Sequence, residues 1–540
     1  TERILAAIWA DLLRLERVGI HDNFFELGGD SILSIRVIAR ASEMGLKLTT
    51  QDVYLHQTVA TLAAAVGNVE LVKADQGMVT GAVPLTPIQH WFFEGNNPEP
   101  HHFNWANYLP APSGVTVAEL RLALGKLIEH HDALRMRFVQ GADGVMAQFI
   151  APLDDDVPLT VVDLTGVPTG EQRATMEARA GELQTSLNLA SGPMLRLVWF
   201  DMGAGRTSHL LLIVNHLVND AISWPILMAD LTNLLRQAHT GDTLRLPAKT
   251  SSYKQWAEDL VEFARTGMGE DERAYWLDKR RWEGEVARLY LDHPDGVNLR
   301  ASGQTFTATL DEQGTRDLMN FARKTQSGID EVLLAALGLT LIRRTGCGRV
   351  LINIERHGRE DIGTGLDLSR TVGWCANISP VLLDLPEKIQ MAEAFLAARA
   401  QIREIPRRGI GFSVLRYLGD AEVREQMRSR PQADIFFNFM GQQGGQSGGK
   451  NSRRMAQQPS MGVLVSTQGQ RRHAIEINSM IRQEQLQMRW AYSTELLEPA
   501  SVEHLAQECI MVIRGILESS AAPVSTKDEI KLGSEVTDAK

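Results

Sequence analysis

The sequence has little cysteine, no long apolar run and no excess of positive charge. Of 540 residues only three are cysteines, Cys347, Cys375 and Cys509. They are too few and too widely spaced for a disulfide framework or a zinc knuckle, so a reducing cytoplasm is the expected compartment. No apolar run approaches the ~20 residues that span a bilayer, and no signal peptide is recognisable, so we expect no membrane. The net charge of −11 argues against nucleic acid as a partner.

The changes of pattern along the chain predict several structural units, because 540 residues exceed what one core holds. Residues 1–68 contain short apolar stretches with helical spacing, such as "ILAAIWADLL" and "TVATLAAAV", and predict a small four-helix bundle. The polar segment 69–82 predicts a linker. From residue 83 strands and helices alternate, which predicts an α/β or α+β domain. The Gly- and Gln-rich stretch 441–454 predicts a mobile loop.

One serine lies where a glycine turn meets an apolar helix, in "FFELGGDSILSI". Gly28 and Gly29 predict a tight turn, and Asp30 predicts the cap of the helix that follows. The Ser31 hydroxyl is then expected at a helix N-terminus, where the positive end of the helix dipole favours a phosphodiester. The residues alone leave two interpretations open: a capped helix with an inert serine, or a covalent attachment site.

The surrounding stretch "DNFFELGGDSILSIRVIAR" closely resembles the peptidyl carrier domains of non-ribosomal peptide synthetases. The resemblance extends over residues 1–75. It implies that Ser31, flanked by Gly29 and Asp30, carries 4′-phosphopantetheine, whose thiol holds an aminoacyl or peptidyl group as a thioester. A thioester carbonyl is more electrophilic than that of an amide, and its α-hydrogen is more acidic. The carrier can therefore serve attack on the carbonyl or removal of the α-proton.

The best candidate for a reactive site in the larger domain is "LLLIVNHLVNDAISWPILMADL". An apolar strand is expected to end at Asn215 and His216, and a helix is expected to begin at Ser223 as its N-cap. His216 and Asp220 would then lie in a strand-to-helix connection, where catalytic groups are common. A histidine moves protons near neutral pH. The residues alone leave open a structural histidine, a catalytic one, or a metal ligand for which no third ligand is apparent.

This stretch resembles the His-containing motif of the condensation and epimerization superfamily, and its Ser-Trp pair resembles the epimerization branch. Further motifs of that family follow the expected order: "LTPIQHWFF", "HHDALRMRF", "INIERHGRED", "DLSRTVGW", "IPRRGIGF" and "FFNFMGQ". The resemblance implies an α/β (α+β) domain of two chloramphenicol-acetyltransferase-like lobes with a tunnel between them. We expect the N-lobe over 83–262, the C-lobe over 263–526 and a C-terminal linker over 527–540.

The same resemblance implies that His216 and Glu355 act as catalytic groups on opposite sides of the tunnel. They would move a proton off and back onto the α-carbon of the thioester, without a metal or a further cofactor. The expected supporting residues are Asn215, Asp220, Ser223, Trp224, Arg135 and Asn438. Arg135 is expected to be the ion-pair partner of Asp220. Glu360 is the alternative to Glu355, although a solvated turn or a salt bridge is the simpler expectation for it, and Cys375 is expected to be a small buried hydrophobe.

Four positions depart from the family pattern. Asn215 replaces the first His of its motif, Ala221 and Arg356 replace glycines, and Phe439 replaces a Tyr. Two alternatives therefore stay open beside an epimerase: a condensation catalyst, in which His216 assists attack of an amine, and a docking domain without catalysis. The "DAISW" and "IERHGRE" stretches and the domain order favour the epimerase. The expected partners are an upstream adenylation domain, a downstream condensation domain and a phosphopantetheinyl transferase.

Overall fold

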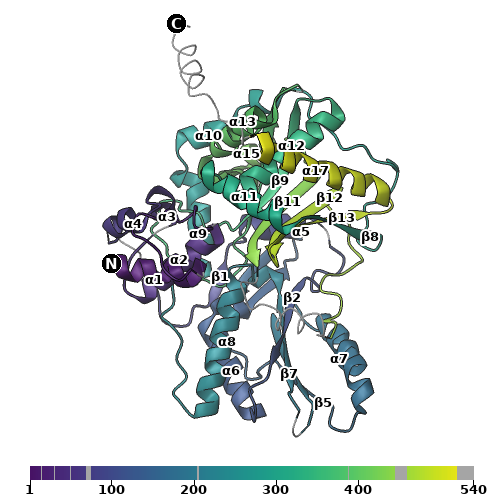
Figure 1. The fold of residues 1–540 in the computed structure, drawn as a ribbon. Coiled ribbons are helices and arrows are strands. Elements are labelled where there is room, and N and C mark those ends of the chain that lie inside the picture. Colours follow the sequence, from purple (N-terminus) through teal and green to yellow (C-terminus); the bar gives the residue numbers. More distant parts are fainter. Residues whose placement is uncertain are drawn as a thin grey trace.

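The computed structural model describes residues 1–13, 15–29, 31–48, 50–67, 74–95, 97–203, 206–386, 388–443 and 459–519. The described chain forms a small helical unit at the N-terminus and two larger lobes (Figure 1). Parts of the sequence-based expectations fall outside these residues: the cap at Asp30, the first part of the linker 69–82, most of the loop 441–454, the end of the expected C-lobe 263–526 and the tail 527–540.

The N-terminal unit consists of four short helices, as the apolar spacing predicts. These are α1 (Glu2–Leu13), α2 (Ser31–Glu43), α3 (Thr50–Leu55) and α4 (Val59–Ala65). Leu5 and Trp9 of α1 pack with Val37 of α2 and Leu62 of α4 around the fully buried Phe24. This core is separate from those of the two lobes, so the unit is a small bundle of its own.

The N-lobe contains two sheets, drawn in the lower part of Figure 1. The first has the order β1 (Gly81–Val83), β4 (Met146–Ile150), β3 (Met136–Gln140), and the second has the order β2 (Asn104–Pro110), β7 (His209–Asn215), β6 (Leu195–Asp201), β5 (Leu159–Asp163). Strand β7 is buried on both faces, because Leu212 faces one apolar core while Leu211 faces another. This burial explains why β7 reads as a continuous apolar run.

The C-lobe is built on one six-stranded sheet. Its order is β10 (Asn377–Asp384), β9 (Arg349–Arg356), β11 (Ile435–Gln443), β12 (Ile475–Arg482), β13 (Gln485–Ser493), β8 (Gly303–Leu310). Strand β11 runs parallel to both β9 and β12. The parallel pairing sets Asn438 of β11 directly beside Glu355 of β9.

Helices cover both lobes. Those of the N-lobe region are α5 (Pro87–Glu94), α6 (Val117–His130), α7 (Thr169–Gln184), α8 (Ser223–Thr240) and α9 (Tyr253–Glu262). Those that follow are α10 (Glu270–Leu277), α11 (Glu312–Lys324), α12 (Ile329–Thr345), α13 (Met391–Arg403), α14 (Ile410–Leu418), α15 (Ala421–Arg428) and α17 (Pro499–Ser519). The short helical turns are η1 (Asp132–Arg135), η2 (His216–Val218), η3 (Phe263–Gly267), η4 (Arg280–Trp282) and η5 (Pro406–Gly409).

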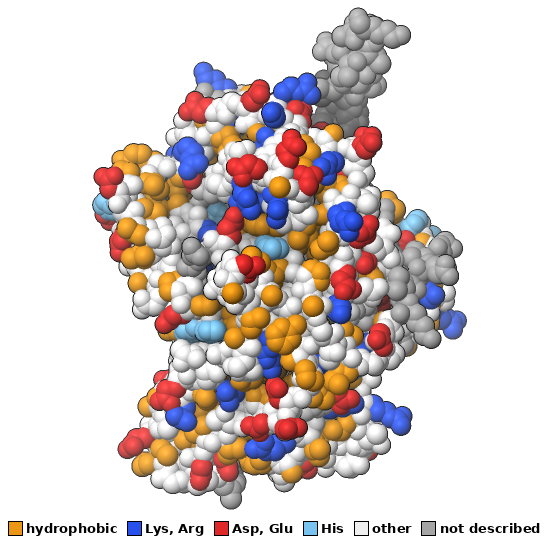
Figure 2. All heavy atoms as spheres, turned by 180° about the vertical axis from the view of Figure 1, so that it is seen from behind, with side chains coloured by type: hydrophobic (Ala, Val, Ile, Leu, Met, Phe, Trp, Pro, Cys, Tyr) orange, Lys and Arg blue, Asp and Glu red, His pale blue; other side chains and the backbone are white. Residues whose placement is uncertain are grey.

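Among the described residues no single helix is long and apolar enough to cross a membrane, and only the pair α11 and α12, bent by 107°, passes such a test together. Helix α12 lies in the C-lobe core, where every residue from Val332 to Ile342 is buried. On the face shown in Figure 2, acidic and basic side chains are interspersed over the lobes.

The segment between β9 and β10 connects the two lobes. After β9 the chain leaves the C-lobe sheet and places Leu368, Val372 and Trp374 in the core of the N-lobe. It then returns to the sheet as β10. Because this segment is shared between the lobes, residues at the end of β9 lie against those that follow β7.

Candidate active site

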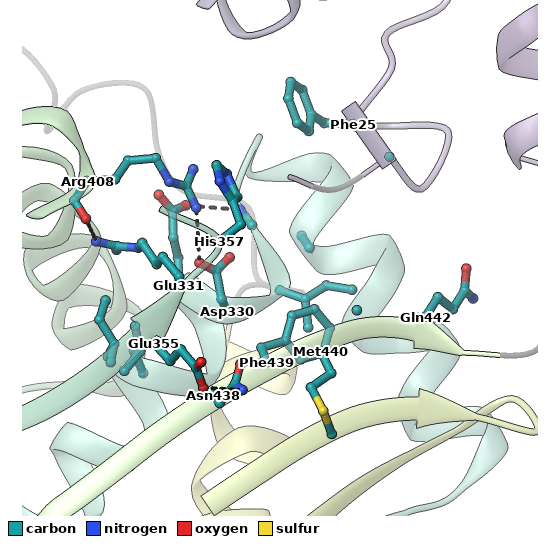
Figure 3. Close-up of a pocket in the computed structure, with 18 of the residues that line it drawn as sticks. Phe25, Asp330, Glu331, Glu355, His357, Arg408, Asn438, Phe439, Met440 and Gln442 are labelled. Atoms are coloured by element: carbon teal, nitrogen blue, oxygen red, sulfur yellow. Dashed lines mark hydrogen bonds and ion pairs between the residues drawn. The ribbon is translucent and has the colours of Figure 1, made fainter. Parts of the chain in front are cut away.

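A pocket of about 650 Å³ lies where the helical unit and the two lobes meet. His216 and Asp220 of the N-lobe line it together with Glu355 and Asn438 of the C-lobe. The helical unit contributes Asn23, Phe25, Glu26, Gly28, Gly29 and Gln57 to the lining (Figure 3). Residues expected from separate sequence motifs therefore share one cavity.

His216 is held in one orientation at the end of β7. Its Nδ1 is 2.7 Å from the carbonyl oxygen of Asn219, so Nδ1 carries the proton and donates it to that oxygen. Nε2 is then left with its lone pair. Burial lowers the pKa of His216 below the ordinary value of 6.5. A neutral imidazole at pH 7 is the form that accepts a proton.

Aromatic rings surround His216. Phe103 stacks on the imidazole at 4.8 Å between ring centroids and an interplanar angle of 12°. Trp105 meets it edge-on at 5.2 Å, and Trp374 lies tilted at 4.7 Å. Trp224, which was expected to support the site, packs on Trp105 at 6.0 Å. These rings bury part of the imidazole, and burial is the physical cause of the lowered pKa.

Asn215, which replaces a family histidine, is fully buried and hydrogen-bonded on both sides of its amide. Its Oδ1 accepts the N–H of Leu217 at 3.0 Å, which caps the turn η2. Its Nδ2 donates to the carbonyl of His101 at 3.1 Å. The side chain therefore shapes the turn that carries His216.

The ion-pair partner of Asp220 is Arg359, and the expectation of Arg135 is wrong. Arg359 Nη2 lies 2.9 Å from Asp220 Oδ2 and 3.0 Å from Oδ1. Arg135 is instead paired with Asp132, three residues before it, at 2.5 Å. Arg135 also donates to the carbonyls of Ile128, Ala151 and Val79. Because these local acceptors satisfy Arg135, it is not available to Asp220.

Ser223 is the first residue of α8, so the expectation that it is the N-cap of this helix is wrong. The capping contact comes from Asp220, whose Oδ1 accepts the backbone N–H of Ser223 at 2.7 Å. The Ser223 hydroxyl donates to Asp220 Oδ1 at 2.8 Å and lies 3.0 Å from the carbonyl of Gly373. Ser223 therefore joins α8 to the segment that crosses from the C-lobe.

Glu355 faces the pocket from the end of β9. Burial, together with the negative charges of Asp220 and Glu476, raises the pKa of Glu355 to about 7. Asn438 Nδ2 donates to Glu355 Oε2 at 2.8 Å, as Figure 3 shows. Asn438 lies within strand β11 and therefore does not close a turn. A carboxyl group with this pKa can both hold and release a proton near neutral pH.

Glu360, the alternative to Glu355, does not line this pocket. It lies 3.4 Å from Arg408 Nε, so the salt-bridge expectation is confirmed, and its side chain is 10% exposed, so the expectation of a solvated turn is wrong. Cys375 is 5% exposed and belongs to the N-lobe core, as expected of a small hydrophobe. Burial raises the pKa of its thiol to about 12. In the described parts of the chain no cluster of three or more His, Cys, Asp or Glu could hold a metal ion.

Ser31 begins helix α2 directly after the turn that borders the pocket. Gly28 has a φ of +99°, in the region that favours glycine. A Cβ on Gly29 would collide with the ring of the buried Phe24, so this position requires glycine. Both glycines line the pocket. An arm attached at Ser31 would therefore start beside residues that line the pocket, and the residues present fit that group.

Sequence reasoning did not identify Arg359 and Trp105 as residues of this site. Arg359 lies in the quoted "INIERHGRED" stretch, and a charged residue buried to 3% exposure requires a partner. Trp105 follows "HHFN", where the sequence carries no signal beyond a strand pattern with an aromatic residue. Only the pairing of β2 with β7 brings Trp105 to His216, because Trp105 is opposite Val214 in that register.

Comparison with known proteins identifies both parts of the chain. Residues 79–538 match the family model "Condensation domain", and residues 3–66 match "Phosphopantetheine attachment site". The chain is 39% identical, over 97% of its length, to a linear gramicidin synthase of Brevibacillus parabrevis, and spans 7% of that protein. It is 33% identical over 94% of its length to tyrocidine synthase 1 of the same organism, of which it spans 47%.

Two solved structures are similar in fold. The epimerization domain from the third module of tyrocidine synthetase B has a TM-score of 0.73 at 30% identity, covering 83% of this chain and 98% of that one. SgcC5 of Streptomyces globisporus has a TM-score of 0.62 at 20% identity, covering 82% and 100%, and shows the fold alone.

The chain belongs to the condensation-domain family, preceded by a phosphopantetheine carrier domain. It is a carrier plus condensation-superfamily domain of a non-ribosomal peptide synthetase, and the carrier match indicates a covalently attached 4′-phosphopantetheine arm.

Proposed function

We propose that this chain inverts the α-carbon of an aminoacyl or peptidyl group held as a thioester on the arm of Ser31. The observation that carries the proposal is that His216 of the N-lobe and Glu355 of the C-lobe line one pocket, whose lining also includes Gly28 and Gly29 of the carrier. When bound, the arm supplies a thioester whose α-hydrogen is more acidic than that of an amide.

His216 is the base in the L-to-D direction. Its Nδ1 proton is committed to the Asn219 carbonyl, so Nε2 accepts the proton from the α-carbon. The rings of Phe103 and Trp374 pack on the imidazole and shield it from water on those sides. The lowered pKa keeps Nε2 unprotonated before each turnover.

Glu355 is the acid in the same direction. With a pKa of about 7 it is partly protonated at neutral pH, and it returns a proton to the opposite face of the α-carbon. Asn438 holds the carboxyl group in place through its bond to Oε2. In the D-to-L direction the two groups exchange roles.

Two considerations favour this reaction over amide formation. Inversion needs proton transfer on both faces of one carbon, whereas assistance to an attacking amine needs one base. The pocket provides both groups, because burial lowers the pKa of His216, which favours the free base, and raises the pKa of Glu355, which favours the free acid. The similar domain of tyrocidine synthetase B is described as an epimerization domain. In the assembly line an upstream adenylation domain, a downstream condensation domain and a phosphopantetheinyl transferase would be the partners.

The test is proton exchange on the full chain. Ser31 is converted to its pantetheinyl form, and the arm is loaded with each of several L-aminoacyl groups in turn. The loaded chain is incubated in heavy water, and the released residue is analysed for chirality and α-deuterium. D-product with α-deuterium is expected, and His216→Ala should lower the rate of deuterium uptake by about 10²- to 10⁴-fold. Glu355→Gln should also lower the rate of deuterium uptake. Glu360→Gln is the matched control and should retain the wild-type rate.

No exchange from a demonstrably loaded arm would overturn the proposal. Addition of an acceptor aminoacyl carrier would then show amide formation if the domain is a condensation catalyst. Loss in Glu360→Gln with retention in Glu355→Gln would exchange the roles assigned to these two carboxyl groups.

A further inference from the structure

A third polar residue continues the row that Glu355 and Asn438 form across the C-lobe sheet. In the parallel register of β11 and β12, Asn438 is directly opposite Asn478. On its other side Asn438 is opposite Glu355, and these two side chains meet in Figure 3. Residues that are opposite one another on neighbouring strands point to the same face of the sheet. Asn478 therefore faces the pocket, and it is one of the residues that line it.

The alternation of burial along β12 supports this placement. Ile477 and Ser479, the neighbours of Asn478 in the strand, are fully buried, and Ile477 packs in the C-lobe core. Asn478 itself is only partly buried. Successive side chains of a strand point to opposite faces, so the core takes Ile477 and the pocket takes Asn478.

The side-chain amide of Asn478 has no partner within the described part of the chain. Neither of its polar atoms is among the fully buried side-chain atoms that lack a hydrogen bond, so the amide is accessible from the pocket. Asn438 differs in this respect, because its Nδ2 donates to Glu355 Oε2. A primary amide offers two donor hydrogens and an acceptor oxygen, and Asn478 has all of them to offer.

The spacing of the sheet limits which part of a substrate the Asn478 amide can meet. Neighbouring strands are about 4.8 Å apart, so Asn478 lies roughly 10 Å from Glu355 along the row. An α-carbon that exchanges a proton with Glu355 lies within about 3.5 Å of its carboxyl group. A substituent of that carbon that extends along the row, with one hydrogen bond of about 3 Å, covers the remaining distance.

The α-nitrogen side is the substituent that matches a polar partner. Of the three groups that stay on the α-carbon during inversion, the thioester carbonyl leads back toward Ser31. The side chain of the carried residue varies in polarity, and Trp105 and Met440 offer it apolar lining. The α-nitrogen is polar in every aminoacyl and peptidyl group. A free amide in the pocket wall therefore suits the one polar substituent that all these substrates share.

We propose that the side-chain amide of Asn478 forms a hydrogen bond with the amino side of the carried residue, at its α-nitrogen or at the amide carbonyl that precedes it in a peptidyl group. The inference rests on the arm entering this pocket, which is part of the proposed function. Asn478 then fixes the rotation of the α-carbon about its bond to the thioester, so that the two faces of this carbon are presented to His216 and Glu355.

The experiment measures protection of the thioester, which does not depend on turnover. The arm of the full chain is loaded with leucyl, N-acetylleucyl or isocaproyl groups, which share one side chain and carry an ammonium, an amide or no nitrogen at the α-carbon. The rate at which hydroxylamine cleaves each thioester is followed by mass spectrometry of the Ser31 peptide. Asn478→Leu removes the amide, whereas Asn478→Asp retains an acceptor and removes the donor.

We expect Asn478→Leu to raise the cleavage rate of the N-acetylleucyl thioester by about fivefold, the factor of one net hydrogen bond, and to leave the isocaproyl rate unchanged. If the α-nitrogen is the partner, the leucyl rate rises as well and Asn478→Asp retains the protection. If the acyl carbonyl is the partner, only the N-acetylleucyl rate rises and Asn478→Asp reacts as Asn478→Leu does.

Gln487→Leu is the matched control, because Gln487 is an amide on the next strand, β13, and lies outside the pocket lining. It should react as the wild type does. If Asn478→Leu does not fold, Asn478→Val, with a side chain that strands favour, takes its place.

Equal rates for wild type and folded Asn478→Leu with both nitrogen-containing groups would overturn the inference. An equal increase for the isocaproyl group would also overturn it, because that group has nothing on its amino side to bind. The same holds if the wild-type thioester is cleaved as fast as leucyl-pantetheine free in solution, since the arm then stays outside the pocket. Protection by Asn478 without α-deuterium uptake would overturn the proposed epimerization and leave the role of Asn478 standing.

Discussion

Arg359 of the C-lobe and Asp220 of the N-lobe form a buried ion pair at 2.9 Å, with side chains 1% and 7% exposed. The carboxylate also accepts the backbone N–H of Ser223 at 2.7 Å and that of Cys375 at 3.1 Å. The Asp220 carboxylate thus caps α8, accepts a hydrogen bond from the segment between β9 and β10, and neutralises Arg359. The His216 turn and the end of β9 are held together by these contacts.

Removal of one partner of this pair should destabilise the whole domain. Arg359→Met leaves the charge of Asp220 buried and uncompensated, so we expect a loss of about 3 to 5 kcal/mol in the free energy of unfolding. Urea denaturation measures it, with Arg280→Met at an exposed pair as the control. The double variant Arg359→Met with Asp220→Asn should be less unstable than the sum of the single variants. Additive losses would show that the pair does not couple the lobes.

The rate of L-to-D inversion should fall as the pH rises through about 7, because Glu355 then loses the proton that it returns to substrate. Asn438→Ala should move this alkaline limb to higher pH. The Asn438 amide donates to Oε2, which favours the carboxylate form, and its loss raises the pKa of Glu355. The pH profile of deuterium uptake measures both. An unchanged limb in Asn438→Ala would show that another group sets it.

The raised pKa of Glu355 should also appear in folding stability. Below pH 4.5 the carboxyl is protonated in both states and contributes nothing; as the pH rises toward 7 only the unfolded state ionises freely, so stability is lost. Above pH 7 the loss is constant, at about 3 kcal/mol. Glu355→Gln removes this loss, so its stability relative to wild type should rise between pH 4 and pH 8.

Urea denaturation at both pH values checks this expectation. Glu425→Gln is the control, since this carboxylate lies on the surface with its side chain 79% exposed. A stability difference between Glu355→Gln and wild type that is the same at both pH values would contradict the raised pKa.

Asn215 should act on stability more than its place in a catalytic motif suggests. Asn215→Ala leaves the N–H of Leu217 and the carbonyl of His101 without their partner, at a cost of about 2 kcal/mol. Thermal denaturation measures this cost. Asn215→Asp retains the acceptor for Leu217 and should recover part of it. A variant as stable as wild type would show that water replaces the amide.

Local pattern was sufficient for the elements that carry the site. The apolar run before Asn215 predicted a strand, and β7 does end at Asn215. The run is continuous because β7 is buried on both faces. The glycine turn before Ser31 was predicted from residue type, since a positive φ at Gly28 is a local property of the chain. His216 and Glu355 were found through motif resemblance, and both line the pocket. Their chemical roles stay predictions.

Partner choice was decided by tertiary structure. Arg135 and Arg359 are both buried, and the sequence does not say which of them reaches Asp220. Arg135 pairs with Asp132 within the same helical turn. Arg359 reaches Asp220 because the segment between β9 and β10 packs against the N-lobe. The parallel register of β11 on β9 likewise pairs Asn438 with Glu355, 83 residues apart.

The sequence by itself therefore determined the two units, the strand and turn that carry His216 and the glycine turn before Ser31, because each depends on residues close along the chain. Only the tertiary structure decided which charges pair across the lobes and which rings enclose His216. Those contacts join segments more than a hundred residues apart, such as Trp105 with His216 and Asp220 with Arg359. Burial then sets the pKa values on which the proposed chemistry depends.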